Sequence, residues 1–286
     1  MHFSVPPDFP FMPVKEFLRK YCGISLTLWR KIKRADKVYV NNLKVIPAIA
    51  MVKGTDTISY TIDHSSAIEP MDLPLSIVYE DTSLLVVDKP AGQLVHPTTA
   101  NRYDTIGNAV LNYYQNQRLP YAFHPVHRLD KNTSGLVLIA KQPQIQHLLS
   151  ADLRTFHRLY LAVTHGIPQQ KNSIINAPIA RCPDSIIKRM VSADGQIAIT
   201  HYRVLRTLPT AALVALHLET GRTHQIRVHL ASIGHPLLGD DLYGGSKLKI
   251  SRQALHAARL RFIHPLTKQL ICLNSRLPYD MQQLLN

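Results

Sequence analysis

Cysteine is scarce in this chain, which holds only three in 286 residues. Cys22, Cys182 and Cys272 lie far apart, and no CxxC pair occurs. This spacing argues against a disulfide framework and against a zinc site built from cysteines, because both need closely grouped thiols. No apolar run is long enough to cross a membrane, and the first thirty residues lack the continuous apolar core of a signal peptide. We therefore expect a protein of the reducing cytoplasm with no membrane partner.

Acidic residues are also few, since 19 Asp and Glu stand against 33 Lys and Arg, a formal net charge of +14. A surplus of this size favours polyanionic partners such as nucleic acid. Hydrophobic residues make up 45% of the chain, which argues against a disordered protein. The length suffices for one large domain and a small one, and we expect a monomer.

The amino-terminal stretch predicts a small module of two helices and a hairpin. VKEFLRKY (14–21) and SLTLWRKIKRA (25–35) place apolar residues at helical spacing, with Gly23 as a breaker and Ser25 as a cap. KVYVNNLKVI alternates around Asn41-Asn42, a pair that suits a two-residue hairpin turn. The module therefore combines helices with a short sheet.

This module carries a concentrated positive charge. From residue 15 to residue 44, nine Lys or Arg stand against two acidic residues, a net charge of +7. Such a patch favours a nucleic-acid surface, and the alternative is an ordinary solvated helix face. The stretch 63–74 is polar, contains two prolines and lacks periodicity, which predicts a linker. The domains are then 1–73 and 74–286.

The second domain is predicted to consist mainly of strands. Aliphatic and β-branched runs, broken by turn signals, lie at 75–81, 83–90, 135–141, 158–166, 195–208 and 211–221. Helical patterns are fewer, near 105–115, 143–151 and 223–233. Many strands with few helices favour an α+β domain on a mainly antiparallel sheet over a doubly wound fold.

A first polar stretch, HPVHRLDKNTSG at 124–135, precedes the apolar run 136–140. Its polar side chains are therefore expected in a loop that enters a buried strand. Arg128 and Asp130 are two residues apart and project to the same side of an extended chain. A carboxylate and a guanidinium displayed together suit a site for an anionic ligand. The alternative is that Asp130 makes only a local bond to the turn backbone.

A second polar stretch, LETGRTHQIRVHLASIGHPLLGDDLYG, covers 218–244. Thr220 is predicted to cap the helix at 223–233. The apolar stripe of this helix comprises Ile226, Leu230 and Ile233. His224 and Arg227 face away from that stripe, so Arg227 can reach a carboxylate elsewhere and hold it ionised. The alternative is a plain solvent-facing Arg.

Taken together, these and other stretches carry a more specific signal than any one alone. The set comprises IVYEDTSLLVVDKPAGQLVHPT (77–98), HRLDKNTSGLVLIAK (127–141), RLYLAVTHG (158–166), the second polar stretch and LHAARLRFIHP (255–265). In this order they resemble the RluA-type family of RNA pseudouridine synthases over about three quarters of the chain. The resemblance implies the pseudouridine synthase fold. Residues 1–73 resemble an S4-type RNA-binding domain, although its usual Arg-Leu-Asp opening appears here as Val14-Lys15-Glu16.

The resemblance implies an isomerase that converts uridines of ribosomal or transfer RNA to pseudouridine. The N1–C1′ bond breaks, the uracil turns, and C5 joins C1′, with no metal and no cofactor. Asp130 matches the family's catalytic carboxylate, which either attacks C1′ or removes a proton from C2′. Arg227 matches the arginine that supplies the opposing charge. Tyr160 matches the tyrosine that stacks on the uracil and assists loss of the C5 proton.

The resemblance also suggests how the RNA is held. A stacked target base must be extruded at a cost of a few kcal/mol, and Arg128 is predicted to fill the gap with its guanidinium plane. The other predicted RNA contacts are Lys89, His127, Arg222, His224, Arg30, Lys31, Lys33 and Arg34. The family's usual Lys two residues before the tyrosine is Arg158 here, which keeps the charge and changes the donor geometry.

Two other functions stay open at this point. A non-catalytic RNA-binding protein on the same fold would need to have lost the carboxylate, yet Asp130, Tyr160 and Arg227 are all present. A metal-dependent hydrolase would use pairs such as His124 with His127, or His224 with His229. No HExxH motif or carboxylate cluster accompanies these pairs, so the sequence predicts no metal site.

Overall fold

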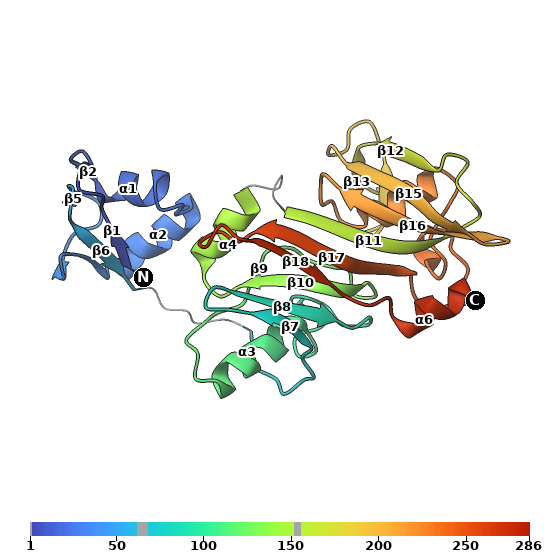
Figure 1. The fold of residues 1–286 in the computed structure, drawn as a ribbon, viewed down its shortest axis with the longest axis horizontal. Coiled ribbons are helices and arrows are strands. Elements are labelled where there is room, and N and C mark those ends of the chain that lie inside the picture. Colours follow the sequence, from blue (N-terminus) through green and yellow to red (C-terminus); the bar gives the residue numbers. More distant parts are fainter. Residues whose placement is uncertain (1, 62–67, 152–155) are drawn as a thin grey trace.

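The computed structural model describes residues 2–61, 68–151 and 156–286. Figure 1 shows a small amino-terminal group of elements beside a larger unit that is built on a long, twisted sheet. The chain ends at the far side of the large sheet, next to the short helix α6 (Tyr279–Gln282).

The amino-terminal group contains two helices and two small sheets. Its elements are β1 (His2–Ser4), β2 (Met12–Pro13), α1 (Val14–Lys20), α2 (Leu26–Ala35), β3 (Val38–Val40), β4 (Leu43–Lys44), β5 (Met51–Val52) and β6 (Thr57–Tyr60). One sheet has the order β1-β6-β3-β4, and β2 pairs with β5. Leu28, Trp29 and Ile32 are buried on one side of α2, where they pack into the hydrophobic cluster of this group.

Two predicted details of this group are confirmed. The Ser25 hydroxyl caps α2 by accepting a hydrogen bond of 3.1 Å from the Leu28 N–H. Asn41 and Asn42 have φ values of 50° and 65°, the left-handed conformation that a two-residue hairpin turn requires. They connect β3 and β4 directly. The predicted linker falls partly on 63–67, which lie outside the described residues, and 68–74 form no helix or strand.

The large sheet contains ten strands. They are β7 (Ile77–Glu80), β8 (Leu84–Lys89), β9 (His124–Pro125), β10 (Ser134–Ala140), β11 (Phe156–His165), β12 (Asn172–Asn176), β15 (Ile199–Thr207), β16 (Ala211–Leu218), β17 (Leu255–Ile263) and β18 (Leu270–Asn274). Their order is β12-β15-β16-β11-β17-β10-β8-β7, with β18 on β17 and β9 on β10. Among the described pairs only β10 and β17 run parallel, so the predicted α+β class with a mainly antiparallel sheet is confirmed.

The parallel contact between β10 and β17 explains the glycine that ends the first polar stretch. Gly135 has φ 111°, and a Cβ atom there would lie 2.3 Å from the Ala257 carbonyl oxygen. Only glycine combines that backbone conformation with such a close approach. The loop before β10 is therefore fixed at its end against a second strand, close to Asp130.

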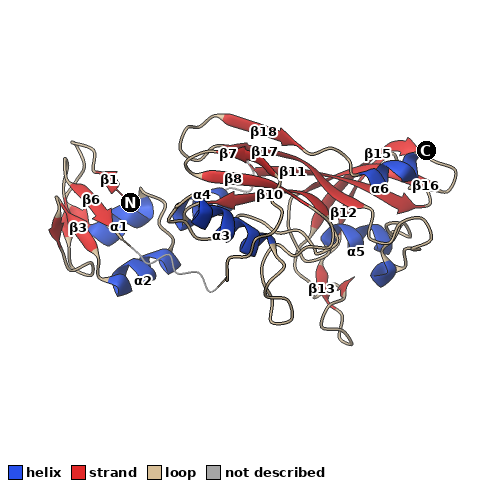
Figure 2. Cartoon of the chain, turned by 90° about the horizontal axis from the view of Figure 1, so that it is seen from below, coloured by secondary structure: helices blue, strands red, loops and turns tan. Residues whose placement is uncertain are grey.

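Two helices cover one face of the large sheet, whereas Ile145 and Leu149 of α4 (Pro143–Ala151) pack against the other face. Figure 2 shows α3 (Ile106–Asn116) and α5 (Gln225–Ser232) on the same side. Their apolar residues share one core cluster with the sheet, including Ile106 from α3 and Ile226 and Leu230 from α5. The remaining elements are the two-stranded β13 (Ile179–Arg181) and β14 (Arg189–Val191), and the short helical turns Asp241–Tyr243 and Gln283–Leu285. None of the described helices is long and apolar enough to cross a membrane.

The helix predicted at 223–233 is present as α5, but its predicted N-cap is wrong. Its N-cap is His224, which has φ 58°, and Thr220 lies too far upstream to cap it. The Thr220 hydroxyl instead accepts from the Ile199 N–H at 3.0 Å and donates to Gln225 Oε1 at 2.8 Å. Ile233 is 38% exposed, so it does not belong to the buried stripe. The left-handed turn at His224 brings the helix start toward the pocket described next.

Candidate active site

A pocket of about 330 Å³ lies where the first polar stretch, β11 and the start of α5 meet. Its walls carry most of the predicted site residues, among them Asp130, Tyr160, Arg227, Arg128 and His224. These residues come from sequence positions nearly one hundred apart. The fold therefore brings both polar stretches to one place.

Asp130 faces an arginine across this pocket. Its carboxylate Oδ2 lies 3.2 Å from Arg227 Nη1, and its side chain is 21% exposed. This ion pair is the carboxylate contact expected for Arg227. It argues against the alternative in which the Asp130 side chain bonds only to the backbone of its own turn. The one described bond to that turn uses the Asp130 backbone carbonyl, which accepts from the Thr133 N–H at 3.1 Å. The carboxylate itself remains directed at the pocket.

Arg227 is held by a second carboxylate that the sequence analysis did not assign. Asp240 accepts from Arg227 Nε at 2.7 Å and from Nη2 at 2.8 Å, and its side chain is only 1% exposed. Burial alone would lower the pKa of Arg227, but the two carboxylates outweigh burial and raise it. The bidentate bond to Asp240 leaves Nη1 as the nitrogen that meets Asp130.

An aromatic residue and a histidine complete this side of the pocket. The guanidinium of Arg227 lies 4.9 Å from the centre of the Tyr243 ring. The Tyr243 hydroxyl accepts from the Arg189 N–H at 3.0 Å and lies 2.8 Å from His224 Nδ1, so it is placed to donate its proton there. That arrangement puts a proton on His224 Nε2, 3.8 Å from Asp130 Oδ2. Burial lowers the pKa of His224, which favours the neutral ring.

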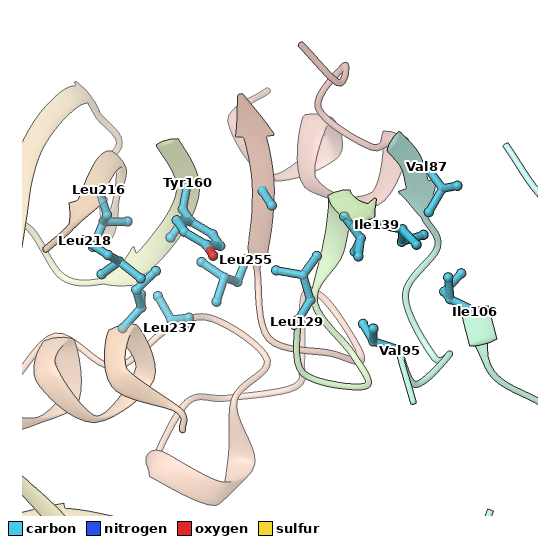
Figure 3. Close-up of a cluster of buried hydrophobic side chains, with 14 of the residues drawn as sticks. Val87, Val95, Ile106, Leu129, Ile139, Tyr160, Leu216, Leu218, Leu237 and Leu255 are labelled. Atoms are coloured by element: carbon cyan, nitrogen blue, oxygen red, sulfur yellow. The ribbon is translucent and has the colours of Figure 1, made fainter. Parts of the chain in front are cut away.

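Tyr160 lies at the floor of the pocket on β11. Figure 3 shows it beside Leu216 and Leu218, with its hydroxyl directed toward Leu255 and with Leu129 across the cluster. Tyr160 is 4% exposed, and burial raises the pKa of its hydroxyl. The group therefore stays protonated at neutral pH and is available as a proton donor or as a ring for stacking.

Arg158, the departure from the family pattern, also lines the pocket. It is 8% exposed, and its guanidinium lies 5.4 Å from the centre of the Phe156 ring. Among the described residues, its Nε has no hydrogen-bond acceptor. This Nε atom is itself buried, so it can meet a ligand only if the side chain moves.

Arg128 and Arg222 are exposed at the pocket wall, as RNA contacts require. The Arg222 Nε also donates to the Ile197 carbonyl at 3.0 Å, which fixes its stem and leaves the other nitrogens of the guanidinium outward. Leu129, between Arg128 and Asp130, is buried but lines the same pocket, so the projection of Arg128 and Asp130 to one side of the loop stays a prediction.

Lys89 does not fit its predicted RNA contact. It is 1% exposed, and its ammonium donates to the carbonyls of Pro90, Gln93 and Lys131 at 2.7–3.0 Å. All three donors are used, and burial lowers the pKa of Lys89 to about 7. This ammonium ties the loop at 90–93 to the residue after Asp130, which is a structural role.

His127 likewise turns inward. Its Nε2 accepts the Leu138 N–H at 3.1 Å, and its ring lies 5.3 Å from that of Phe156. Burial lowers its pKa to about 3, so the ring is neutral and offers no charge to a phosphate. A direct RNA contact for His127 therefore has little support in this geometry.

The described residues contain no group of three or more His, Cys, Asp or Glu side chains placed to hold a metal ion. The pairing of His224 with His229 fails for a specific reason. His229 uses both ring nitrogens within the fold, Nδ1 with the Thr200 hydroxyl at 2.8 Å and Nε2 with the Ala177 carbonyl at 2.9 Å.

Known proteins that are similar to this chain are RNA pseudouridine synthases, in agreement with the residues that line the pocket. The family model "RNA pseudouridylate synthase" matches residues 83–232. RNA pseudouridine synthase YjbO of Bacillus subtilis, itself described as uncharacterized, is 39% identical over 96% of this chain and 98% of its own. Ribosomal large subunit pseudouridine synthase D of Zymomonas mobilis is 43% identical over 76% of this chain and 73% of its own. The solved structure of human RNA pseudouridylate synthase domain containing 4 superposes with a TM-score of 0.60 at 26% identity, covering 73% of this chain and 91% of that one. The chain therefore belongs to the RNA pseudouridine synthases, of the RluA type that its motifs resemble.

Proposed function

We propose that this enzyme isomerises specific uridines in structured RNA, using Asp130 as its catalytic carboxylate. One observation carries the assignment: Asp130 lies in the pocket 3.2 Å from a buried arginine that Asp240 fixes from behind. Ribosomal RNA is the first candidate substrate, because several relatives are named ribosomal large subunit pseudouridine synthases. Transfer RNA is the second. We place the reaction in the cytoplasm and expect a monomer.

The proposed reaction begins when the target uridine leaves its stack and enters the pocket. Arg128 then occupies the vacated position, since its exposed guanidinium can stack on neighbouring bases. Asp130 either attacks C1′, so that N1 of the uracil leaves, or removes the C2′ proton to give a glycal. Arg227 stabilises the ionised carboxylate while RNA excludes water from the pocket.

Tyr160 serves the second half of this reaction. Its ring lies on the pocket floor, where it can stack on the freed uracil while the base turns. After C5 has joined C1′, the C5 proton must leave, and we propose that the Tyr160 hydroxyl relays it: its oxygen receives the C5 proton while its own proton passes to the Asp130 carboxylate, whose charge acts on Tyr160. The Arg158 guanidinium lines the pocket and can meet a uracil carbonyl or the phosphate of the target nucleotide.

Release of tritium from RNA labelled at uridine C5 tests this function. Every conversion to pseudouridine expels that hydrogen, so the wild-type enzyme should release tritium from total cellular RNA. Release should continue at the same rate in EDTA, because no step requires a metal. Good RNA binding without any release from any RNA class would instead favour the non-catalytic RNA-binding protein. Loss of release in EDTA would contradict the metal-free reaction proposed for this pocket.

We further propose that residues 1–73 form an S4-like RNA-binding domain joined to a catalytic domain at 74–286. The support is the basic face of α2, which comprises Arg30, Lys31, Lys33 and Arg34. All four side chains are exposed, while the opposite side of the helix is buried. The described part of the chain pairs Lys20 with Glu16 and Lys44 with Asp36, and it gives these four no acidic partner.

Replacing the basic face of α2 with alanines should weaken RNA binding and flatten its salt dependence. Each phosphate contact that is lost should reduce the slope of log K against log salt by about 1. Titrations of labelled ribosomal RNA at several salt concentrations would measure this slope. The matched control replaces four exposed cations outside the module: Lys171, Arg206, Lys249 and Lys268. Equal slopes for both variants would remove α2 from the RNA interface.

A further inference from the structure

Two more hollows adjoin the catalytic pocket. A middle hollow of about 460 Å³ is lined by 94–98 and 125–129, and it shares the wall 126–129 with the catalytic pocket. An outer hollow of about 390 Å³ is lined by 68–69, 96–99 and 102–103, and it shares 96–98 with the middle one. The three hollows therefore follow one another from Asp130, past Arg128, to the loop at 96–104.

That loop is braced by its own polar groups. The Asn101 N–H donates to the Thr98 hydroxyl at 3.1 Å, and Asn101 Oδ1 accepts from the Asp104 N–H at 3.3 Å. Gln93 donates to the Asp104 carboxylate at 3.3 Å. The Asn108 side-chain amide, on α3, donates to the backbone carbonyl of Arg102 at 2.9 Å. This bond does not involve the Arg102 side chain. The loop thus has a defined shape before any ligand arrives.

Two side chains of this loop are left outward. Tyr103 is 54% exposed, and Arg102 is exposed beside it. No hydrogen bond or ion pair of either side chain is found within the described residues. His96 between the middle and outer hollows is also exposed, with its ring 5.9 Å from that of Phe123. An exposed ring, a guanidinium and an imidazole along one groove are the groups that bind single-stranded RNA by stacking and by phosphate contact.

The charge of the groove agrees with such a strand. Arg128 and Arg102 stand at its two ends, and among the described residues the one acidic side chain lining the hollows beyond the catalytic pocket is Glu69. Because the groove begins where the target uridine is proposed to bind, its continuation suits the same RNA chain. A ligand other than RNA would have to bind in this groove next to the RNA chain that occupies the catalytic pocket.

We infer that nucleotides flanking the target uridine lie along this groove, with one base stacked on Tyr103 and a phosphate at Arg102. This inference rests on the proposed function and adds to it the path of the substrate strand. It makes Tyr103 and Arg102 determinants of RNA affinity that never touch the reacting atoms. Their loss should therefore raise KM and leave kcat unchanged.

The experiment uses the full chain and the variants Tyr103→Ala and Arg102→Ala. Tritium release from C5-labelled total RNA gives kcat and the apparent KM, and each variant should lower kcat/KM by about tenfold through KM. A fluorescein-labelled oligouridylate of nine nucleotides should lose affinity by a similar factor, whereas a three-nucleotide probe should bind as it does to wild type. The controls are Tyr279→Ala, at a ring that is 73% exposed, and Arg206→Ala, at an exposed arginine on β15.

The outcomes separate this inference from the proposed function. Wild-type release combined with unchanged KM and probe affinity in both variants would overturn the groove and leave the function intact. No wild-type release, combined with loss of nine-nucleotide binding in both variants, would support the groove and overturn the function. A fall in kcat alone would overturn the groove, because it would place Tyr103 or Arg102 in the chemistry or in the pocket's folding.

Discussion

Asp130→Asn should abolish pseudouridine formation while RNA affinity stays within about threefold of wild type, because the carboxylate serves the chemistry and not the phosphates. The amide has almost the same shape, but it can neither attack C1′ nor accept the C2′ proton. We expect turnover to fall by more than about a thousandfold, the scale typical for removal of a nucleophile or base.

The pocket should survive this substitution. Arg227 keeps its bidentate bond to Asp240, so its guanidinium stays in place when the partner at 3.2 Å loses its charge. Removing a negative charge from an RNA-facing pocket also favours phosphate binding slightly. Loss of affinity as large as the loss of rate would therefore contradict the catalytic role and indicate that Asp130 holds the RNA.

The measurement pairs single-turnover tritium release with an independent binding titration on the same labelled RNA. Asp194→Asn is the matched control, because Asp194 is an exposed turn residue that lines none of the described hollows. It should behave as wild type in both assays. Slow residual turnover in Asp130→Asn that rises on storage would point to deamidation of the new side chain back to Asp.

The sequence predicted those parts of the fold that local patterns determine. Ser25 and Asn41-Asn42 were identified because caps and tight hairpins depend on the residues at the turn itself. The N-cap of α5 was missed because His224 adopts φ 58°, which no local preference of histidine requires. Its bond to Tyr243 and its position over Asp130 come from tertiary packing.

In the pocket, too, the features that depend on tertiary packing were the ones that the sequence did not predict. Asp130 and Arg227 were paired in advance by the family resemblance, which agrees with the need of an ionised carboxylate for an opposing charge in a closed site. Lys89 was predicted to contact RNA, yet its ammonium donates to the nearby Pro90 and Gln93 carbonyls and to the Lys131 carbonyl, which lies 42 residues further along the chain. Asp240 received no role because the sequence alone does not show which buried group it faces.

Asp240→Asn is the second substitution with a large expected effect, because the buried Arg227 guanidinium loses its charged partner and one of the two hydrogen bonds to residue 240. An asparagine can accept one of the two hydrogen bonds, but its NH2 group would then face an N–H donor of Arg227. Breaking a buried ion pair costs about 3–5 kcal/mol when one partner is removed, and the amide should lose somewhat less. Without the bidentate bond to Asp240, the Arg227 guanidinium would tilt toward Asp130. A shift of about 1 Å in a catalytic pair can cost about a hundredfold in kcat.

A purely structural role for Asp240 would lower stability without lowering kcat of the folded enzyme, so both must be measured. Urea unfolding should show the loss of stability, and tritium release under conditions where the variant is folded should show kcat reduced with KM nearly unchanged. Glu80→Gln provides the control, since Glu80 pairs with the buried Lys141 at 2.7 Å and lines none of the described hollows. That variant should lose stability and keep its kcat. If Asp240→Asn did the same, Arg227 would hold its position toward Asp130 without help, and the carboxylate behind it would serve only the fold.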